Sequence, residues 1–419
     1  MDCNKQAPEK VRLGVIGLGG RGRGLLSLLT NMDDVYIPAV SDLYEDRMEK
    51  AAENTFTKRG YKPELYSDYK KLLERDDIDG VIIPSSWTAH AEIAIEAMNS
   101  GKYAAMEVGG ASSINECWEL VKTSEKTGKP CMMLENCCYG REELSLLHMI
   151  KRGMFGELIH CQGGYEHDLR SEVSNGLINR HYRFRNYKNR NGELYPTHEL
   201  GPIAKYLNIN RGNRMLSLTS MASKSRGLHK YIVDTMGADS ELAPIDFAQG
   251  DIVTTMIKCA HGETIFLIHD TTLPRPYSRG GRVQGTKGIW MEDNSSVYFD
   301  GVSPLDKWEP FEKYMTENEH PLWKWYKEEG IRGGHGGMDY LVLRAYVESI
   351  KNQTDTPIDV YDTAAWMAIT CLSEDSVAMG SMPVSIPDFT NGKWIRRDAP
   401  VPGRYCLDLI CNPDGTISL

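Results

Sequence analysis

The first 150 residues alternate between short apolar runs and longer amphipathic stretches, as expected when strands and helices follow each other in turn. The apolar run VRLGVI at 11–16 breaks at GLGGRG, and a helical pattern follows over 21–29. Alternation of this kind predicts a doubly wound parallel sheet. The other elements that the pattern predicts are strands at 35–41, 80–85, 103–107 and 131–136, and helices at 45–57, 88–101 and 113–127.

After about residue 155 the pattern changes to apolar and polar positions with a period of two. This alternation is typical of antiparallel strands that face solvent on one side. We therefore expect a second, largely antiparallel sheet. Its predicted strands lie at 157–166, 214–222, 250–259, 263–270, 281–286 and 289–299, with amphipathic helices at 337–352 and 361–379 and a long irregular loop at 170–193.

Gly17, Gly19 and Gly22 form a GxGxxG spacing between the first predicted strand and its helix. The first glycine permits a tight turn, the second lets backbone approach a pyrophosphate, and the third allows close helix packing. Asp42 ends the second strand, where a carboxylate binds the adenosine ribose and repels a 2′-phosphate. The motif predicts a Rossmann domain that prefers NAD to NADP, although Arg47 lies nearby in the chain. A glycine turn with a solvated aspartate is the alternative.

The length of 419 residues exceeds that of one typical domain, so we expect two. The predicted fold class is α/β, with an N-terminal Rossmann doubly wound parallel sheet and a C-terminal α+β domain. The largely antiparallel sheet of the second domain is expected to pack over the cofactor cleft. The predicted boundaries are a flexible tail at 1–10, the NAD-binding domain at 11–150, the second domain at 151–395 and an extension at 396–419.

The amino-acid composition makes some classes of binding partner improbable. Lys and Arg number 48 against 58 Asp and Glu, and the resulting charge of −10 disfavours nucleic acid or an anionic membrane as the main partner. No apolar run approaches the roughly 18–20 residues of a spanning helix, so we expect no integral membrane segment. The cysteines show no metal-like spacing, and we predict no metal. Cys137 and Cys138 are expected to pack as small apolar residues.

The start of the chain, Met-Asp-Cys followed by NKQAPEK, leaves two localisations open. As given, the chain has no signal peptide and would be soluble and cytoplasmic. A periplasmic lipoprotein whose signal was trimmed before an acylated Cys3 would begin in the same way.

The segment GVIIPSSWTAHAEIAIEAMNSGKYAAMEVGGA at 80–111 resembles the Gfo/Idh/MocA oxidoreductase superfamily. In that superfamily an aromatic residue and a helical histidine precede a Glu-Lys-Pro motif. Here Val108 and Gly109 replace the lysine and proline, so the resemblance implies a cofactor site without its usual proton-transfer lysine. The cofactor residues assigned by motif and resemblance are Gly17, Gly19, Gly20, Arg21, Gly22, Asp42, Trp87, His90, Glu107, Val108 and Asn136.

The resemblance becomes narrower in the second half and covers residues 11–395. It implies glycoside hydrolase family 109, NAD-dependent α-N-acetylgalactosaminidases that act on a small molecule or glycan with terminal N-acetylgalactosamine and hold NAD throughout turnover. The segments that carry it are MMLENCCYGREE (132–143), GELIHCQGGYEHDLR (156–170), ELYPTHELGPIAKYLNINRGNR (193–214), SLTSMASKSRGL (217–228), QGTKGIWME (284–292) and GGHGGMDYLV (333–342).

NAD-dependent glycosidases depart from the usual pair of catalytic carboxylates. The resemblance implies oxidation of the sugar at C3, proton loss at C2, elimination at C1, water addition and re-reduction. It places catalysis at Tyr165, Tyr195 and His198. We assign His198 to the C3 hydroxyl proton and Tyr165 to the C2 proton, with a phenol pKa lowered by a nearby Arg or His. Tyr195 would position the sugar or assist the leaving group, and His167 would bind sugar hydroxyls beside these three.

Alternatives remain at this stage. Without the resemblance, the tyrosines would be core residues and His198 a helix cap. A sugar or inositol dehydrogenase, a glycosidase for another anomer or sugar, and a non-catalytic NAD-binding sensor are the rival functions. His335 is expected to line the cleft and Asp339 to cap a helix. The C-terminal sheet is also a surface through which a homo-oligomer could form.

Overall fold

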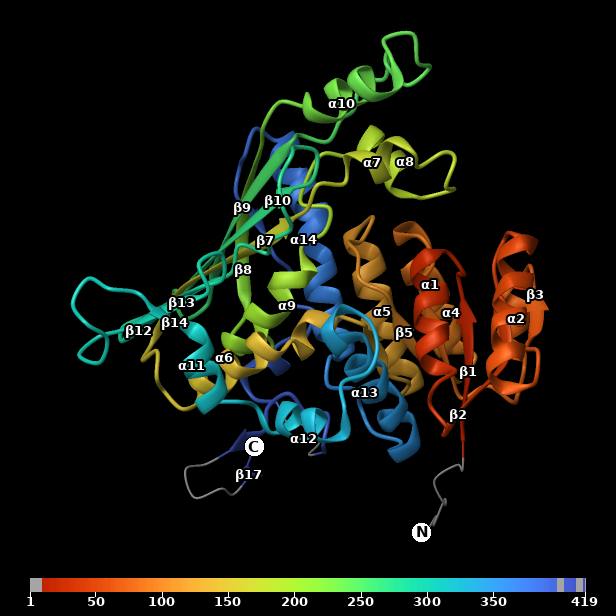
Figure 1. The fold of residues 1–419 in the computed structure, drawn as a ribbon, viewed down its shortest axis with the longest axis horizontal. Helices are drawn as coiled ribbons and strands as arrows, with labels where there is room; N and C mark the ends of the chain where they lie inside the picture. Colours follow the sequence, from red (N-terminus) through yellow and green to blue (C-terminus); the bar gives the residue numbers. More distant parts are fainter. Residues whose placement is uncertain (1–9, 398–402, 412–416, 419) are drawn as a thin grey trace.

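The computed structural model describes residues 10–397, 403–411 and 417–418, which are organised around two sheets (Figure 1). The first sheet, drawn in red to orange, is parallel throughout, with strand order β3-β2-β1-β4-β5-β6. Its strands are β1 (Val11–Ile16), β2 (Val35–Ser41), β3 (Glu64–Tyr66), β4 (Gly80–Ile83), β5 (Tyr103–Met106) and β6 (Cys131–Met133). The helices between them are α1 (Gly20–Leu29), α2 (Glu45–Arg59), α3 (Tyr69–Leu73), α4 (Trp87–Asn99) and α5 (Ile114–Thr127).

The strand order confirms the predicted doubly wound sheet. It reverses between β1 and β4, and in open parallel sheets ligands bind outside the carboxyl ends of the strands at such a switch point. Strands β4, β5 and β6 are buried at every position, which explains why they read as continuous apolar runs. The unpredicted β3 and α3 span only three and five residues and carry too little apolar pattern to stand out.

The second sheet has nine strands in the order β14-β13-β12-β11-β7-β10-β9-β8-β15. All neighbours are antiparallel except β7 and β10, which confirms a largely antiparallel sheet. The strands are β7 (Leu158–Glu166), β8 (Met215–Ala222), β9 (Ile252–Cys259), β10 (Thr264–Asp270), β11 (Arg282–Gly285), β12 (Gly288–Met291), β13 (Ser296–Phe299), β14 (Glu309–Pro310) and β15 (Val384–Ser385).

Two sequence-based predictions for this region are wrong. The single strand expected at 289–299 is a hairpin, because the polar residues 292–295 turn the chain and Ser295 adopts a left-handed φ of 45°. The loop expected at 170–193 contains two short helices, α7 (Arg170–Ser174) and α8 (Arg183–Asn189). Only a few buried side chains, such as Val173 and Phe184, anchor them among polar neighbours, so their periodicity is weak.

Two helices from the C-terminal part of the chain pack against the first sheet. The phenol of Tyr346, in α13 (Met338–Asn352), donates to the Val81 carbonyl of β4. Helix α14 (Val360–Ala378) lies between the two sheets (Figure 1) and is buried almost all round, rather than amphipathic as expected. The boundary near residue 150 therefore stays a prediction. The remaining helices are α6 (Arg141–Lys151), α9 (Thr197–Tyr206), α10 (Gly227–Met236), α11 (Phe311–Glu317) and α12 (Pro321–Glu329), with η1 at Asn136–Tyr139.

Within the described part of the chain, no helix has the length and apolar character needed to span a bilayer. The acylation reading of Cys3 falls on residues 1–9, outside the described residues. Cys137 and Cys138 carry free, buried thiols, as expected of packed apolar residues.

Candidate active site

The glycine turn between β1 and α1 is packed against the loop after β4. Gly17 has a φ of 108°, and a Cβ there would lie 2.8 Å from the backbone nitrogen of Ser85. A Cβ on Gly22 would overlap the carbonyl oxygen of Gly17, whereas one on Gly20 would meet nothing within 4 Å. Helix α1 begins directly after Gly19, so its free N–H groups lie at the switch point. This cradle fits the pyrophosphate of a dinucleotide.

Asp42 joins this turn to the end of β2. Its Oδ2 accepts a hydrogen bond from the backbone of Leu18 at 2.6 Å, and its Oδ1 accepts one from the backbone of Tyr44 at 3.0 Å. Arg47 lies 3.9 Å from the same carboxylate. The buried carboxylate of Asp42 therefore lies where the ribose of NAD is expected, with Arg47 beside it.

The EVGGA stretch at 107–111, after β5, has no room for the proline of the superfamily's Glu-Lys-Pro motif. A Cβ on Gly109 would overlap the indole ring of Trp87, and a Cβ on Gly110 would overlap the side chain of Thr370 in α14. Val108 is buried beside them. A proline at position 109 would therefore require Trp87 to move.

We expect Gly109→Ala to lower the free energy of unfolding by about 1–3 kcal/mol, because the methyl group overpacks a buried site. Urea unfolding followed by circular dichroism measures the change. Gly24→Ala is the matched control, since Gly24 is exposed in α1 with open space around it and alanine is the better helix former. A Gly109→Ala protein as stable as the parent would contradict this packing.

Three predicted cofactor residues, Arg21, Glu107 and Asn136, belong to one network that includes the acidic side chain of Asp339. Arg21 donates to Glu107 at 2.9 Å and to both oxygens of Asp339 at 2.7 and 2.9 Å. Asn136 also donates to Asp339, at 2.8 Å, and His335 Nδ1 lies 2.8 Å from it. Although burial opposes ionisation, these partners hold the pKa of Asp339 well below its usual value. The expectation that Asp339 caps a helix is wrong, because its carboxylate is taken up by this network.

His90 and Trp87 support the crevice from α4. Burial lowers the pKa of His90 to about 4, so the ring is neutral, and its Nε2 lies 3.1 Å from the Ser85 carbonyl. It thereby holds the loop that packs on the glycine turn. Trp87 is buried, with its ring 4.8 Å from Tyr182 and 5.7 Å from Tyr195. Contact of either side chain with NAD stays a prediction.

The three predicted catalytic side chains lie together. Tyr165 comes from β7, Tyr195 from the segment before α9, and His198 from the first turn of α9. The rings of the tyrosines are 4.4 Å apart, and that of Tyr165 is 5.6 Å from His198. The hydroxyl of Tyr195 lies 3.4 Å from His198 Nε2, and that of Tyr165 lies 3.0 Å from His167 Nδ1.

The expected lowering of the Tyr165 pKa is wrong. Burial raises this pKa, and the nearby charge of Arg183 opposes the rise without reversing it. Burial also raises the pKa of Tyr195 well above its usual value. The pKa of His167 is lowered, chiefly by burial, so its neutral ring can accept a hydrogen bond from the Tyr165 hydroxyl.

Two further residues belong to this cluster and were not predicted. The guanidinium of Arg183 lies 5.8 Å from the ring centre of Tyr165 and 5.4 Å from that of Tyr195. The half-exposed ring of Tyr277 lies 5.1 Å from His167. Both residues lie in segments of the sequence without a clear helical or strand period, so no pattern marks them. The aromatic and basic run HYRFRNY at 181–187 is the one signal that could have pointed to Arg183.

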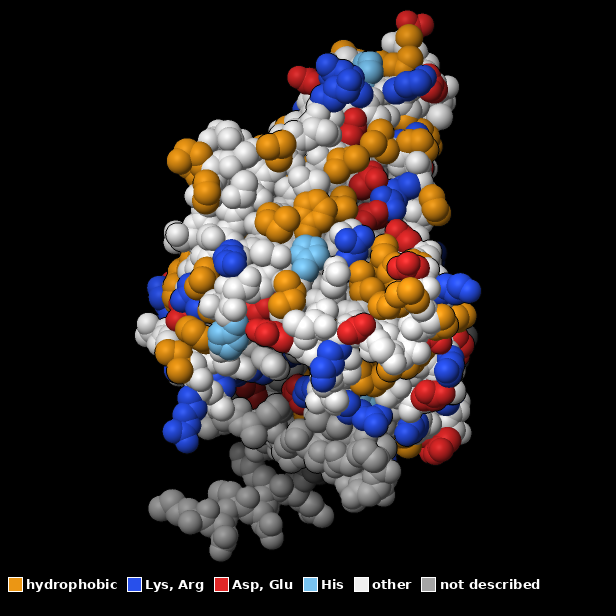
Figure 2. Space-filling model, turned by 90° about the vertical axis from the view of Figure 1, so that its left-hand side faces the viewer, with side chains coloured by type: hydrophobic (Ala, Val, Ile, Leu, Met, Phe, Trp, Pro, Cys, Tyr) orange, Lys and Arg blue, Asp and Glu red, His pale blue; other side chains and the backbone are white. Residues whose placement is uncertain are grey.

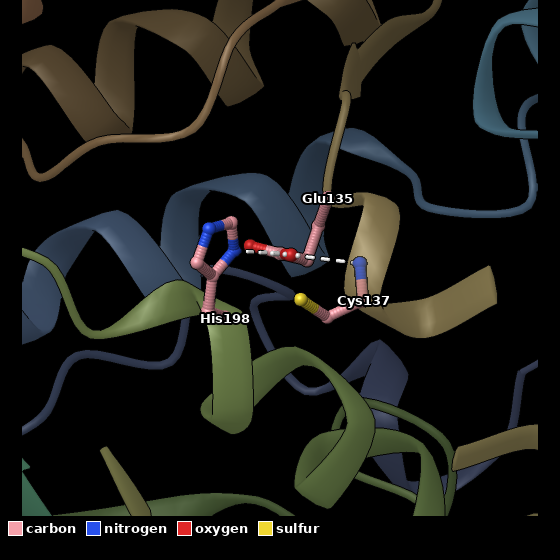
Figure 3. Close-up of side chains that lie close together, drawn as sticks. All are labelled: Glu135, Cys137 and His198. Carbon is pink, nitrogen blue, oxygen red and sulfur yellow. Dashed lines mark hydrogen bonds and ion pairs between the residues drawn. The ribbon is translucent and has the colours of Figure 1, made fainter. Parts of the chain in front are cut away.

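His198 is held from the opposite side by Glu135 (Figure 3). The Nδ1 and Oε1 atoms are 2.8 Å apart, and the Sγ of Cys137 completes a group of potential metal ligands within 4.8 Å of one another. Two atoms bound to a tetrahedral zinc ion at about 2.0–2.1 Å lie about 3.3 Å apart. The 2.8 Å separation is therefore that of a hydrogen bond. Burial raises the pKa of Cys137 well above its usual value, which keeps the thiol protonated.

The fold and the crevice define an NAD-binding protein of the oxidoreductase type. Residues 11–135 match the oxidoreductase family with an NAD-binding Rossmann fold. Levoglucosan dehydrogenase in complex with NADH superposes with a TM-score of 0.66, at 19% identity over 90% of this chain and 100% of that one. Scyllo-inositol dehydrogenase from Lactobacillus casei, with NAD(H) and scyllo-inositol bound, gives 0.65 at 13% identity over 90% and 99%. These two likenesses show the fold, and the match to the NAD-binding family gives NAD as the cofactor of this chain.

The second half defines the family. Residues 139–396 match the C-terminal domain of glycosyl hydrolase 109. A glycosyl hydrolase family 109 protein of Stenotrophomonas maltophilia is 43% identical, with 93% of this chain and 91% of that protein covered. An α-N-acetylgalactosaminidase of Tannerella forsythia is 42% identical over 92% and 88%, and one of Shewanella oneidensis is 41% identical over 92% and 86%. The chain belongs to glycosyl hydrolase family 109, which confirms the resemblance, and it is an NAD-dependent glycoside hydrolase.

Proposed function

We propose that this protein hydrolyses terminal α-N-acetylgalactosaminides of glycans or small molecules, with NAD bound throughout the cycle. The cluster of Tyr165, Tyr195 and His198 carries the proposal. Glycosidases that do not use a redox cofactor place two carboxylates across the scissile bond, whereas this cluster consists of two phenols and an imidazole. The activity of the Tannerella and Shewanella relatives supports the choice of sugar.

When bound, NAD supplies reversible hydride transfer at the sugar C3. His198 takes the C3 hydroxyl proton at Nε2, the nitrogen that faces Tyr195. Tyr165 removes the C2 proton as a phenolate, whose charge the nearby guanidinium of Arg183 favours against burial, and His167 Nδ1 lies 3.0 Å from its oxygen. Tyr195 and Arg183 hold the sugar against these groups.

Release of nitrophenol from 4-nitrophenyl α-N-acetylgalactosaminide, with no added NAD, tests the proposal. We expect many turnovers per protein molecule because the cofactor is regenerated in each cycle. A dehydrogenase would reduce its cofactor stoichiometrically and release no nitrophenol. A panel of α- and β-linked N-acetylgalactosaminides and N-acetylglucosaminides separates the rival glycosidases, since elimination at C1 can proceed from either anomer.

The segment 176–183, which we term the clasp, closes the adenosine end of the crevice. Arg180 forms an ion pair with Asp46 of α2 at 2.7 Å, and its guanidinium lies 4.2 Å from the centre of the Tyr44 ring. Arg47 in turn donates to backbone carbonyls of the clasp. These contacts connect the second half of the chain to the end of β2. They support retention of NAD between turnovers.

Arg180→Glu should increase the rate of NAD loss about three- to tenfold, because a like-charge pair and a lost cation–π contact replace two weak, exposed attractions. The NAD that remains bound after dilution is measured by chromatography over time. The charge swap Asp46→Arg with Arg180→Glu should restore retention, and Arg185→Glu, at an exposed position of α8, is the control. Unchanged loss in the single variant would show that the clasp does not retain the cofactor.

The outer face of the second sheet supports self-association of two copies. One row across it consists of Thr219, Met256, Phe266 and Gln162, which pair in register on neighbouring strands. Figure 2 shows that side of the molecule, where apolar side chains lie among uncharged surface and charged groups of both signs. A face without strong charge of one sign suits a two-fold contact, in which like surfaces meet.

We expect Met256→Glu to convert a dimer into monomers, because it places two carboxylates in the contact. Sedimentation velocity measures the mass in solution. Phe56→Glu, on exposed α2 of the first sheet, is the matched control and should leave the mass unchanged. A parent protein that sediments as a monomer at micromolar concentration would refute self-association.

A further inference from the structure

Glu135 reaches the cluster from the first sheet. It lies between β6 and η1, whereas its partner His198 belongs to α9 (Figure 3). Its Oε1 lies 2.8 Å from His198 Nδ1 and also accepts a hydrogen bond from the backbone of Cys137 at 3.1 Å. The side chain is fully buried, and a Cβ on Gly201 would come within 2.9 Å of its stem. Helix α9 therefore packs directly on this carboxylate and fixes its direction.

The group that can balance the negative charge of Glu135 is the ring of His198, which is positive only when it is protonated. Burial alone would raise its pKa, but attraction to His198 and hydrogen bonds to its carboxylate outweigh burial, so the pKa is lowered and the group is ionised. Among the described residues, Glu135 forms an ion pair with His198 and with no Lys or Arg. Its Oε2 is buried without a hydrogen bond. A buried anion without a fixed cation favours positive charge on the ring beside it.

The hydrogen bond also selects a tautomer. A carboxylate accepts only, so Nδ1 carries hydrogen and the lone pair lies on Nε2. That nitrogen faces the Tyr195 hydroxyl at 3.4 Å. We propose that Glu135 is a positioning residue that holds His198 as the Nε2 base and stabilises the imidazolium formed during C3 oxidation. This inference rests on the proposed function.

Proton and electron balance is complete in this step. The C3 alcohol loses hydride to NAD⁺ and its hydroxyl proton to Nε2, while Nδ1–H stays bonded to Glu135. On re-reduction at C3 both return, and the imidazole is neutral again. Glu135 itself never becomes protonated. Its role resembles that of the carboxylate in a Ser-His-Asp triad, although here the carboxylate follows strand β6 of the first sheet and the histidine lies in helix α9.

The other groups facing His198 are neutral or lie further away. Burial raises the pKa values of both tyrosines and of the Cys137 thiol, and lowers that of His167. Arg183 stands over the tyrosine rings and disfavours a second positive charge. Among the described residues, the carboxylate of Glu135 is thus the charged group that is hydrogen-bonded to the His198 ring. The titratable and charged neighbours that bear on His198 are Glu135, Cys137, Tyr165, His167, Arg183 and Tyr195.

The pH profile of Glu135→Gln in the NAD-loaded protein tests this role. We expect kcat to fall about 10²-fold, because the amide no longer neutralises the imidazolium. The acid-side limb of kcat/KM should move to lower pH, since the amide no longer stabilises positive charge on the adjacent ring. Glu135→Asp keeps the charge on a shorter stem, so it should lower kcat but retain the parent's acid-side midpoint.

Glu193→Gln is the matched control. Glu193 is equally buried, and burial raises its pKa to about 8, so near pH 7 it is already neutral and the amide should change neither kcat nor the pH profile. A Glu135→Gln profile with the parent's midpoint would reduce Glu135 to a structural role and overturn the inference. So would an Asp variant whose midpoint moves, or stoichiometric zinc found by elemental analysis. Activity retained after loss of His198 would instead overturn the proposed function.

Discussion

Tyr165→Phe should lower the rate of nitrophenol release about 10³-fold while leaving the fold and the bound NAD intact. Only the hydroxyl that takes the C2 proton is removed. The ring still packs 4.4 Å from Tyr195 and beside Arg183. Because C3 oxidation precedes proton loss at C2, the variant should still accept hydride from the sugar and stop at the ketone.

That block has a spectroscopic signature. A single addition of substrate to Tyr165→Phe should produce bound NADH, seen by its near-ultraviolet absorbance, without release of nitrophenol. Tyr298→Phe, on β13, serves as the control and should turn over normally. If Tyr165→Phe turns over within about threefold of the parent, the C2 base is another group, since general-base catalysis contributes at least about 10²-fold.

His198→Gln should abolish both signals. We expect a loss of about 10³-fold in nitrophenol release and no accumulation of NADH, because the C3 hydroxyl then lacks its proton acceptor. Glutamine is preferred to alanine, since its amide can still donate to the buried Glu135 carboxylate, whereas alanine would leave that charge without a partner. NAD content and the circular dichroism spectrum are the controls.

The two variants together order the steps. NADH without nitrophenol in Tyr165→Phe, and neither in His198→Gln, is the expected pair of results. The reverse pattern would exchange the two roles. Full turnover in both would show that neither side chain carries the chemistry, whereas a parent protein that binds NAD and releases no nitrophenol would favour the non-catalytic sensor.

The sequence predicts the first sheet better than the second. The buried strands β1, β4 and β5 are continuous apolar runs, and the glycine motif marks the turn beside them. The sequence predicts one strand where the structure has the hairpin β12–β13, because apolar and polar residues alternate in both strands and the turn between them is only four residues long. Helices such as α11 were missed because seven residues with three buried positions give too little periodicity.

The catalytic residues were predicted from the resemblance to a family rather than from the pattern of apolar and polar positions. Tyr165 and Tyr195 are buried in the core and by pattern alone are indistinguishable from structural tyrosines. The error in the Tyr165 pKa arose because burial, which outweighs Arg183, cannot be read from neighbours in the chain. Glu135 was placed inside a predicted strand, and only the meeting of β6 with α9 gives it a partner.

The contact between Gly109 and Trp87 has an evolutionary consequence. An ancestor with proline at position 109 could not have held the indole where it now lies, and the present indole leaves no space for a side chain there. Because Trp87 also packs on Tyr182 and Tyr195, its displacement would disturb the catalytic cluster. A side chain at position 109 would therefore need a compensating change at Trp87, so the two positions can vary only together.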